Sequence, residues 1–324
     1  MKKVTSRMVA AAAGVSQSTV SKVINNSPEV APETARHVIR TAQQMNYPLI
    51  PRNRQETVAV IIRPGEMSGY TASMLSALSN ELLLRKLRIE IIFDHQLELL
   101  NERCFSGGVA ISWDRELTRQ WGEYFTVPLI RINGAADHSR NCWSISYDGE
   151  SAMENLVETL YKLGHRNIGF FSYSSLQQEL ENIACRYQGF IHALRRRKLD
   201  ESFVLFDIKA EAVEKLTAVL ESWRRRKLTA LIFPNELGNM LIDRVCRLLD
   251  IRIPEDMSLV CWEMKSGSEF FTPPHTTLSI MPQEVCKKAV DMLFDRIAAR
   301  GQGTMADVYL PYRLIMRQSV GKAP

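Results

Sequence analysis

The hydrophobic positions of this chain follow two periods, and both recur from residue 57 onward. Short apolar runs, typical of buried strands, alternate with longer segments whose apolar residues recur at helical spacing. The predicted strands are TVAVII (57–62), IEIIF (89–93), VAIS (109–112), PLIRI (128–132), WSIS (143–146), IGFF (168–171), FVLFDI (203–208), ALIF (230–233), SLVCW (258–262) and TTLSI (276–280), with a last strand inside 308–316. The predicted helices are 71–86, 150–163, 176–197, 211–226 and 237–249, with one more that ends near residue 299. This alternation predicts an α/β fold with two parallel lobes.

The first 25 residues predict two short helices joined by a tight turn. A serine or threonine hydroxyl can accept a hydrogen bond from a first-turn N–H group, so Thr5 and Ser16 are candidate caps of the two helices. Gly14 can end the first helix, because glycine adopts the left-handed conformation without a Cβ clash. The apolar stripe of the second helix is formed by Val20, Val23 and Ile24.

The opposite face of the second helix is polar. Its side chains are amides, hydroxyls and one lysine, with no acid among them: Gln17, Ser18, Ser21, Lys22 and Asn25. A helical hairpin packed on a core does not need such a face, whereas a helix that enters the DNA major groove does. The pattern therefore predicts a helix-turn-helix, and an ordinary core hairpin is the alternative.

A third helix is predicted from Pro32 to about residue 46, and Ala31 offers it no capping side chain. We expect residues 1–47 to form a helical head and residues 48–56 to form a linker. Two prolines bias this linker toward extended conformations.

The formal charge is unevenly distributed. Residues 1–56 hold eight Lys or Arg residues and three acids, whereas the rest of the chain holds 33 of each. The whole net charge of +5 therefore lies in the head and linker. Such a basic segment is expected of a module that binds a polyanion such as DNA.

Cysteine spacing and hydropathy indicate the compartment. The six cysteines lie far apart and form no Cys-x-x-Cys pair, which predicts buried, reduced thiols in the cytoplasm. The mostly alanine run 8–15 is short for an export signal, and no stretch is long and apolar enough to span a membrane. Motifs for catalysis, phosphate binding and dinucleotide binding are absent, as is any His/Cys cluster with metal-ligand spacing. We therefore expect no enzyme activity, no cofactor and no metal site.

The head resembles that of the LacI/GalR family of bacterial transcription regulators. Residues 9–25, VAAAAGVSQSTVSKVIN, match the family pattern V-A-x-x-A-G-V-S-x-x-T-V-S-x-V-[IL]-N. The resemblance implies that base edges are read by Gln17, Ser18 and Lys22. It also implies phosphate contacts from Thr5, Ser16, Thr19, Ser21, Asn25 and Thr34. This division agrees with the chemistry, because base edges require donors and acceptors in defined places, whereas phosphates accept from any hydroxyl, amide or N–H group.

The core also resembles this family, in the stretches LGHRNIGF (163–170), RYQGFIHAL (186–194), RIPEDMSLVCWE (252–263) and TPPHTT (272–277). The implied fold is that of periplasmic sugar-binding proteins, with a core of residues 57–324. The first lobe would comprise about 57–147 and 282–313, and the second lobe about 148–281 and 314–324.

Open α/β sheets bind ligands at the carboxyl ends of their strands, and the resemblance implies an effector site there, between the lobes. Its residues would be Tyr70, Asp148, Arg186, Asn235 and Glu263. Charged groups, an amide and an aromatic ring suit a sugar or sugar derivative, since they bind adjacent hydroxyls and cover an apolar ring face. The alternative is that Arg186 and Asp148 only tie the lobes together.

Several positions depart from the family pattern. Asn235-Glu236 and Glu263 stand where Asn-Asp and Asp are usual, and Ile280-Met281 replaces a usual Gln-Pro. The linker lacks the Ala-Arg-x-x-Leu segment that folds on DNA in the family. We therefore expect an extended linker that kinks the operator little.

The sequence thus predicts a cytoplasmic, homodimeric transcription regulator, a repressor, whose affinity for a double-stranded operator is shifted by a small molecule in the core. The absence of leucine heptads after Ser319 favours a dimer over a tetramer. The apolar stripe Met74, Leu78 and Leu82 would be core or, alternatively, dimer face. Two other functions stay open: a ligand-binding protein with a degenerate head, which would show no salt-dependent DNA binding, and an α/β hydrolase or dehydrogenase.

Overall fold

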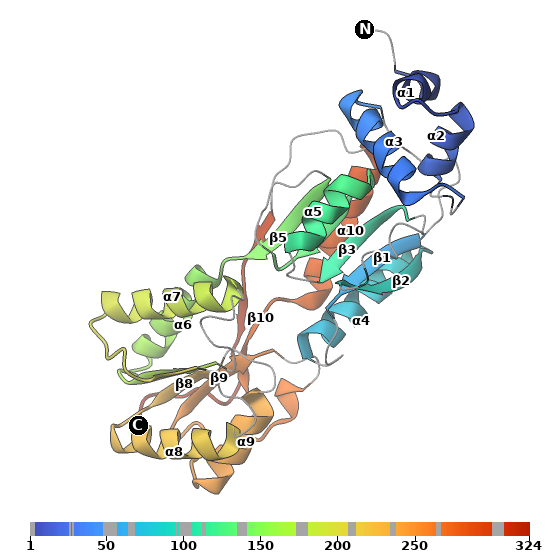
Figure 1. Ribbon diagram of the computed structural model, residues 1–324. Coiled ribbons are helices and arrows are strands. Elements are labelled where there is room, and N and C mark those ends of the chain that lie inside the picture. The colour runs from blue at the N-terminus through green and yellow to red at the C-terminus, as the bar shows by residue number, and fades with distance from the viewer. Residues whose placement is uncertain are drawn as a thin grey trace. The chain divides into compact units, whose positions relative to one another are not determined.

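The computed structural model describes residues 4–25, 27, 29–47, 57–63, 69–94, 96, 105–111, 115–134, 141–172, 181–206, 212–233, 238–263, 267–299 and 308–324. The predicted linker and Asn235 lie outside these ranges, so the extended linker stays a prediction. Helices and strands alternate along the core as the hydrophobic pattern predicts (Figure 1).

The head contains α1 (Ser6–Ala12), α2 (Gln17–Ile24) and α3 (Pro32–Gln44). Thr5 and Ser16 cap the first two helices as predicted, and Gly14 lies between them with a φ of +65°. Ala31 gives α3 no side-chain cap, which agrees with the sequence. The three helices share one core, which includes Val9, Val20, Val23, Val38 and Ala42. This shared core fixes the orientation of α2 within the head.

The first sheet of the core has the strand order β11–β5–β4–β3–β1–β2. Its strands are β1 (Thr57–Ile62), β2 (Arg88–Phe93), β3 (Gly107–Ile111), β4 (Leu129–Ile132), β5 (Cys142–Tyr147) and β11 (Val308–Leu310). β1 pairs in parallel with both β2 and β3, and every residue of β1 is buried, as expected of a central parallel strand. The helices beside this sheet are α4 (Gly69–Leu84), α5 (Arg115–Tyr124) and α10 (Pro282–Ala298).

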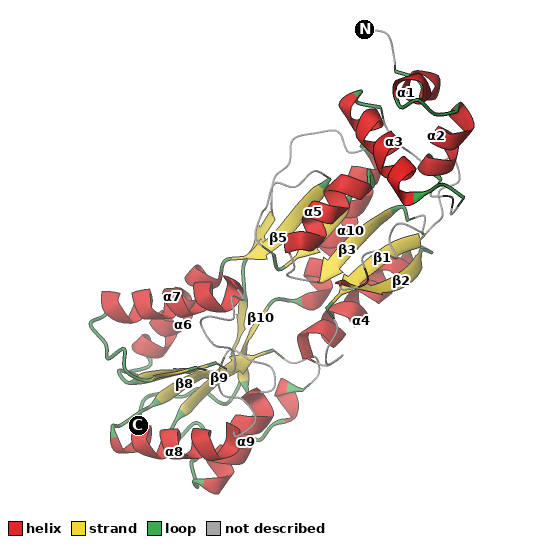
Figure 2. Ribbon diagram, viewed as in Figure 1, coloured by secondary structure: helices red, strands yellow, loops and turns green. Residues whose placement is uncertain are grey.

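The second sheet has the order β12–β10–β9–β8–β6–β7 and, with its helices, belongs to a separate compact unit. Its strands are β6 (Ile168–Phe171), β7 (Val204–Leu205), β8 (Ala230–Phe233), β9 (Ser258–Trp262), β10 (Thr276–Ser279) and β12 (Arg313–Ile315). Helices α6 (Gly149–Lys162) and α7 (Glu181–Arg196) lie on one side of the sheet, and α8 (Ala212–Arg225) and α9 (Gly238–Leu248) lie on the other (Figure 2). Neighbouring strands of this sheet pair in parallel, except β10 with β12, which are antiparallel.

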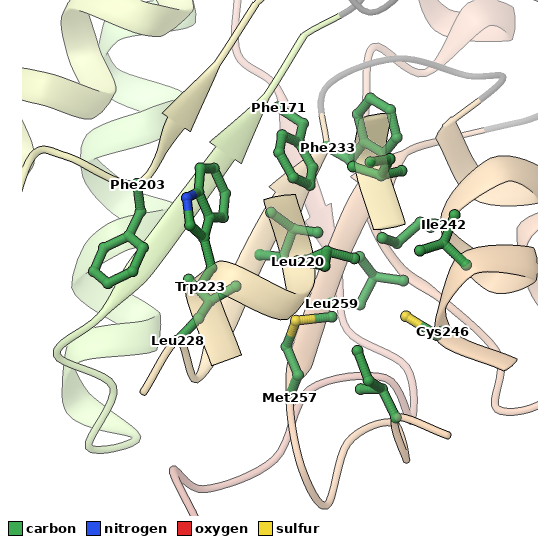
Figure 3. Close-up of a cluster of buried hydrophobic side chains, with 14 of the residues drawn as sticks. Phe171, Phe203, Leu220, Trp223, Leu228, Phe233, Ile242, Cys246, Met257 and Leu259 are labelled. Atoms are coloured by element: carbon green, nitrogen blue, oxygen red, sulfur yellow. The ribbon is translucent and has the colours of Figure 1, made fainter. Parts of the chain in front are cut away.

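Successive residues of a strand point to opposite faces, and β6 shows how this builds two cores. Phe170 packs in the cluster beside α6 and α7, together with Leu156 and Phe190. Phe171 packs in the cluster beside α8 and α9, where it stacks on Trp223 with ring centroids 4.7 Å apart (Figure 3). A continuous apolar run such as IGFF is therefore required, because both faces of the strand are covered.

Three elements differ from the sequence prediction. Helix α5 was not predicted, because only Leu117 and Trp121 mark its buried face among polar residues. Strand β7 is shorter than the predicted 203–208. The predicted last strand within 308–316 is two strands, β11 and β12, which belong to different sheets. They are separated at Pro311, which has no backbone N–H group to donate to a ladder.

The apolar stripe of α4 is core rather than dimer face, since Met74, Leu78 and Leu82 are fully buried. The Sγ of Cys286 on α10 donates to the carbonyl of Met74 at 3.5 Å, so α4 and α10 are in contact. Among the helices that the structure describes, none is long and apolar enough to cross a membrane.

Candidate functional site

The polar face of α2 is exposed because the opposite, apolar face packs in the core of the head. Val20 and Val23 are 0 % and 4 % exposed, whereas Gln17, Ser18 and Lys22 are all exposed. The three residues predicted to read bases therefore lie together on the outer surface of one helix. The six residues predicted to contact phosphates all lie in the described part of the head, and none of them is buried.

Each predicted base-reading side chain already has a partner within the head. Gln17 Nε2 donates to the Oγ of Ser6 at 3.0 Å, and the Oγ atoms of Ser18 and Ser16 lie 2.7 Å apart in a hydrogen bond. Lys22 Nζ forms an ion pair with Glu29 Oε2 at 2.5 Å. Helix α2 itself carries no acid, as predicted, but Glu29 from the turn that follows it lies beside Lys22.

The predicted phosphate-binding hydroxyls also organise the helices that carry them. Ser16 Oγ accepts from the backbone N–H of Thr19 at 3.0 Å and lies 2.8 Å from Thr19 Oγ1. Asn25 donates through Nδ2 to the carbonyl of Ser21 at 2.8 Å. Thr34 lies in the first turn of α3 and is half-buried. A hydroxyl that caps a helix has oxygen lone pairs and a rotatable proton left for a further partner.

The residues predicted for the effector site occupy different elements. Tyr70 lies at the start of α4, and Asp148 caps α6 by accepting from the N–H of Ser151 at 2.9 Å. Arg186 lies on α7, and Glu263 follows β9 directly. Asn235 lies outside the described residues.

Close packing of two helices positions Arg186. A Cβ at Gly189 would lie 2.6 Å from Glu150 Cα, and a Cβ at Gly149 would lie 3.2 Å from Arg186 Cγ. Gly189 is therefore required for this approach of α6 and α7, because its neighbour is backbone, whereas a side chain at Gly149 would press on Arg186 itself. In the motif Arg186-x-x-Gly189, the glycine allows the close helix contact, and this contact holds the arginine in position one turn away on α7.

Arg186 is 7 % exposed. Its guanidinium lies in a cluster of aromatic rings that was not predicted from the sequence. Its Cζ is 3.9 Å from the centre of the Trp262 ring, and its Nη2 donates to Tyr312 Oη at 2.8 Å. The Tyr312 ring packs against Tyr147 and Trp262, with centroids 5.1 Å and 5.2 Å away. No ion pair joins Arg186 to Asp148 or to any other acid within the described residues. Aromatic faces can stabilise a cation without neutralising its charge.

Glu263 has internal partners of a different kind. Arg317 holds it in a bidentate pair, with Nη2 3.0 Å from Oε1 and Nη1 3.2 Å from Oε2. The hydroxyl of Thr277 also donates to Oε2, and Arg317 Nη1 donates to the carbonyl of His275 at 2.7 Å. Both charged side chains are only 17 % exposed. Arg317 could not be predicted as the partner of Glu263, because it lies 54 residues further along the chain.

The described part of the chain contains no candidate metal site, and most of its thiols are buried. No group of three or more His, Cys, Asp or Glu side chains there could hold a metal ion. Cys142, Cys246, Cys261 and Cys286 are buried free thiols as predicted, while Cys185 is exposed. Burial raises the pKa of Cys246 to about 12, which keeps that thiol protonated and unreactive.

A helix-turn-helix head followed by a core of two parallel α/β units defines a DNA-binding regulator with a ligand-binding type of core. The family described as bacterial regulatory proteins, lacI family, matches residues 7–48, and the periplasmic binding protein-like domain matches residues 157–320. The chain belongs to the LacI family of bacterial transcription regulators.

Relatives match nearly the full length of the chain, and a solved structure shares its fold. The HTH-type transcriptional repressor PurR of Pectobacterium carotovorum is 25 % identical, covering 98 % of this chain and 96 % of that protein. The regulator MalR of Streptomyces coelicolor is also 25 % identical, with the same coverage. A lac repressor dimer bound to operator has a TM-score of 0.67 at 21 % identity, covering 98 % of this chain and 99 % of that chain. These relatives are transcription regulators, and the chain is a DNA-binding regulator rather than an enzyme.

The Glu263–Arg317 pair generates a prediction about stability. Replacing Arg317 by Met leaves a largely buried carboxylate without its cation, so the free energy of unfolding should fall by about 2–3 kcal/mol. The double variant Arg317→Met with Glu263→Leu should recover most of this loss, because no buried charge then remains. Urea unfolding of the wild type, the single variant and the double variant measures these free energies. Equal stability of Arg317→Met and wild type would refute the structural role of the pair and favour Glu263 as a ligand-binding group.

Proposed function

We propose that the protein is a cytoplasmic repressor that binds a palindromic operator as a homodimer and is controlled by a small molecule bound in its core. The observation that carries the proposal is the exposed polar face of α2, held outward by the burial of Val20 and Val23. In this mode Gln17, Ser18 and Lys22 read base edges in the major groove. The capping hydroxyls, with Ser21, Asn25 and Thr34, contact phosphates and set the register.

The alternative of a degenerate head has less support. A degenerate head would be expected to lose its caps or its core, whereas here Thr5 and Ser16 cap their helices and the three helices share buried apolar residues. A DNA titration at several salt concentrations separates the two functions, because DNA binding weakens steeply with salt.

For the effector we propose a sugar or sugar derivative that contacts Arg186, with Trp262 and Tyr312 supplying ring faces. Arg186 forms no ion pair with an acid among the described residues. Such an arginine can donate several hydrogen bonds to hydroxyl or anionic oxygens, and aromatic faces cover apolar sugar surfaces. Solved structures of similar fold are described as a CelR–cellobiose complex (TM-score 0.68, 23 % identity) and a LacI family regulator of Enterococcus faecium with bound ribose (TM-score 0.71, 17 % identity). These likenesses suggest which ligand class to try first.

For the homodimer we propose a face on the first unit of the core. Leu83, Leu84 and Ile91 are 62 %, 79 % and 45 % exposed, at the end of α4 and on β2. β2 is an edge strand of its sheet, and exposed apolar side chains on an edge are expected to be covered by a partner.

Selection of bound DNA fragments tests the base-reading residues. Lys22→Ala and Gln17→Ala should each relax sequence preference at particular half-site positions, because a good bidentate base contact discriminates by about 1–3 kcal/mol. Thr19→Ala should weaken binding to every sequence alike, since it removes a phosphate contact. An unchanged sequence preference in Lys22→Ala would contradict this docking of α2.

Calorimetry tests the effector site. A sugar panel that includes cellobiose and ribose identifies the tightest binder, and Arg186→Ala should then lower its affinity about a hundredfold while operator binding persists. Arg195→Ala, which removes an exposed arginine from the same helix, is the matched control and should bind the sugar normally. Equal affinity in Arg186→Ala and wild type would rule out this site.

Sedimentation equilibrium tests the dimer face. Leu84→Glu should dissociate the dimer, because a charge would be buried against apolar side chains in the interface. Leu248→Glu provides the control, since Leu248 is 61 % exposed on α9 of the other unit. A Leu84→Glu variant that remains fully dimeric would place the interface elsewhere.

A further inference from the structure

An acid stands beside the cation on the exposed face of α2. Lys22 Nζ lies 2.5 Å from Glu29 Oε2, and their side chains are 49 % and 65 % exposed. Glu29 belongs to the turn between α2 and α3, so it comes from outside the recognition helix. Of the two acids in the described part of the head, Glu29 and Glu33, it is the one that forms an ion pair with the proposed base-reading surface.

The backbone holds both partners of this pair in place. The N–H of Ser27 donates to the carbonyl of Lys22 at 2.8 Å, which ties the turn to the residue that carries the cation. The N–H of Val30 donates to the carbonyl of Ser27 at 3.2 Å, and Val30 packs against the head core. Glu29 is therefore presented by a turn that is anchored at both ends.

Stability alone does not account for this acid. An exposed ion pair contributes little to folding, because water and salt screen the two charges and two long side chains must be ordered. The hydrogen bond from Lys22 lowers the pKa of Glu29, so the carboxylate is ionised at neutral pH. The pair then has no net charge, and Lys22 loses most of its attraction for phosphates. An acid here thus weakens sequence-independent binding, which depends on neutralising phosphates.

We infer that Glu29 determines operator specificity by acting with Lys22 as one reading unit. This inference rests on the proposed role of Lys22 at base edges. An ammonium group has three donors, so Lys22 can keep Glu29 and still donate to guanine O6 and N7. The carboxylate has acceptor positions left over and accepts from the N4 amino group of a nearby cytosine. The same carboxylate repels phosphates when no such base is present, so it disfavours other sequences.

The test compares two variants that change the net charge of the head equally. Glu29→Gln removes the paired acid, and Glu33→Gln removes an exposed acid in the first turn of α3 that forms no ion pair within the described residues. Selected fragments give the sequence preference of each full-length protein, and salt titrations on random DNA give sequence-independent binding.

We expect Glu29→Gln to bind random DNA more tightly than the wild type. The dependence of its binding constant on salt concentration should be steeper, by the amount that about one additional phosphate contact gives. Its preference for the operator over random DNA should fall at least about fivefold, with loss of a G·C preference at the positions that Lys22→Ala also changes. Glu33→Gln should keep the wild-type sequence preference.

An unchanged sequence preference in Glu29→Gln would overturn the inference. An equal loss of sequence preference in Glu33→Gln would also overturn it, because net charge alone would then explain the effect. If Lys22→Ala alone alters the preference, the proposed function stands and the role of Glu29 falls. If neither Lys22→Ala nor Glu29→Gln alters it, both fall. Circular dichroism of each variant confirms that the exposed substitutions leave the head folded.

Discussion

The burial of Val20 and Val23 in the head core is the constraint on which the DNA-binding surface depends. These two side chains pack with Val9 and Val38 from the neighbouring helices, and this contact leaves α2 one possible orientation. Everything polar on α2 is then turned to solvent, including the amides, hydroxyls and lysine that suit base edges. A polar residue at position 20 or 23 would place an unpaired group in the core and loosen the surface that presents Gln17 and Lys22.

The sequence predicted those features that depend on neighbours along the chain. The caps at Thr5 and Ser16, the turn at Gly14 and the apolar strands follow from local spacing and from backbone chemistry, and the structure confirms them. The contacts it missed are made by residues distant in sequence, such as Arg317 with Glu263 and Tyr312 with Arg186. A single sequence carries no signal for such pairs, because hydrophobic periodicity describes which face is buried and not which residue lies opposite.

Two of the three charged groups predicted for the effector site, Glu263 and Arg186, differ physically. Glu263 is neutralised by a bidentate arginine and a hydroxyl, so a ligand would have to displace three hydrogen bonds to reach it. Arg186 is stabilised by aromatic faces and a phenol oxygen, which leave its positive charge uncompensated within the described residues. A buried cation in this state gains most from a ligand that offers oxygen acceptors. Of these two side chains, Arg186 is therefore the one whose charge remains available to a ligand of the proposed kind.

Similar reasoning applies to the head, where the side chains proposed to read bases already have partners in the absence of DNA. Gln17 is held by Ser6, and Lys22 is held by Glu29. Such contacts reduce the rotamer freedom that binding would otherwise remove, so the entropic cost of forming base contacts is smaller. They also oppose binding wherever the bases offer no replacement partner, because a hydrogen bond is then lost without return. If these side chains read bases as proposed, the internal contacts lower the general affinity for DNA. A DNA sequence that replaces both contacts is then preferred over other sequences.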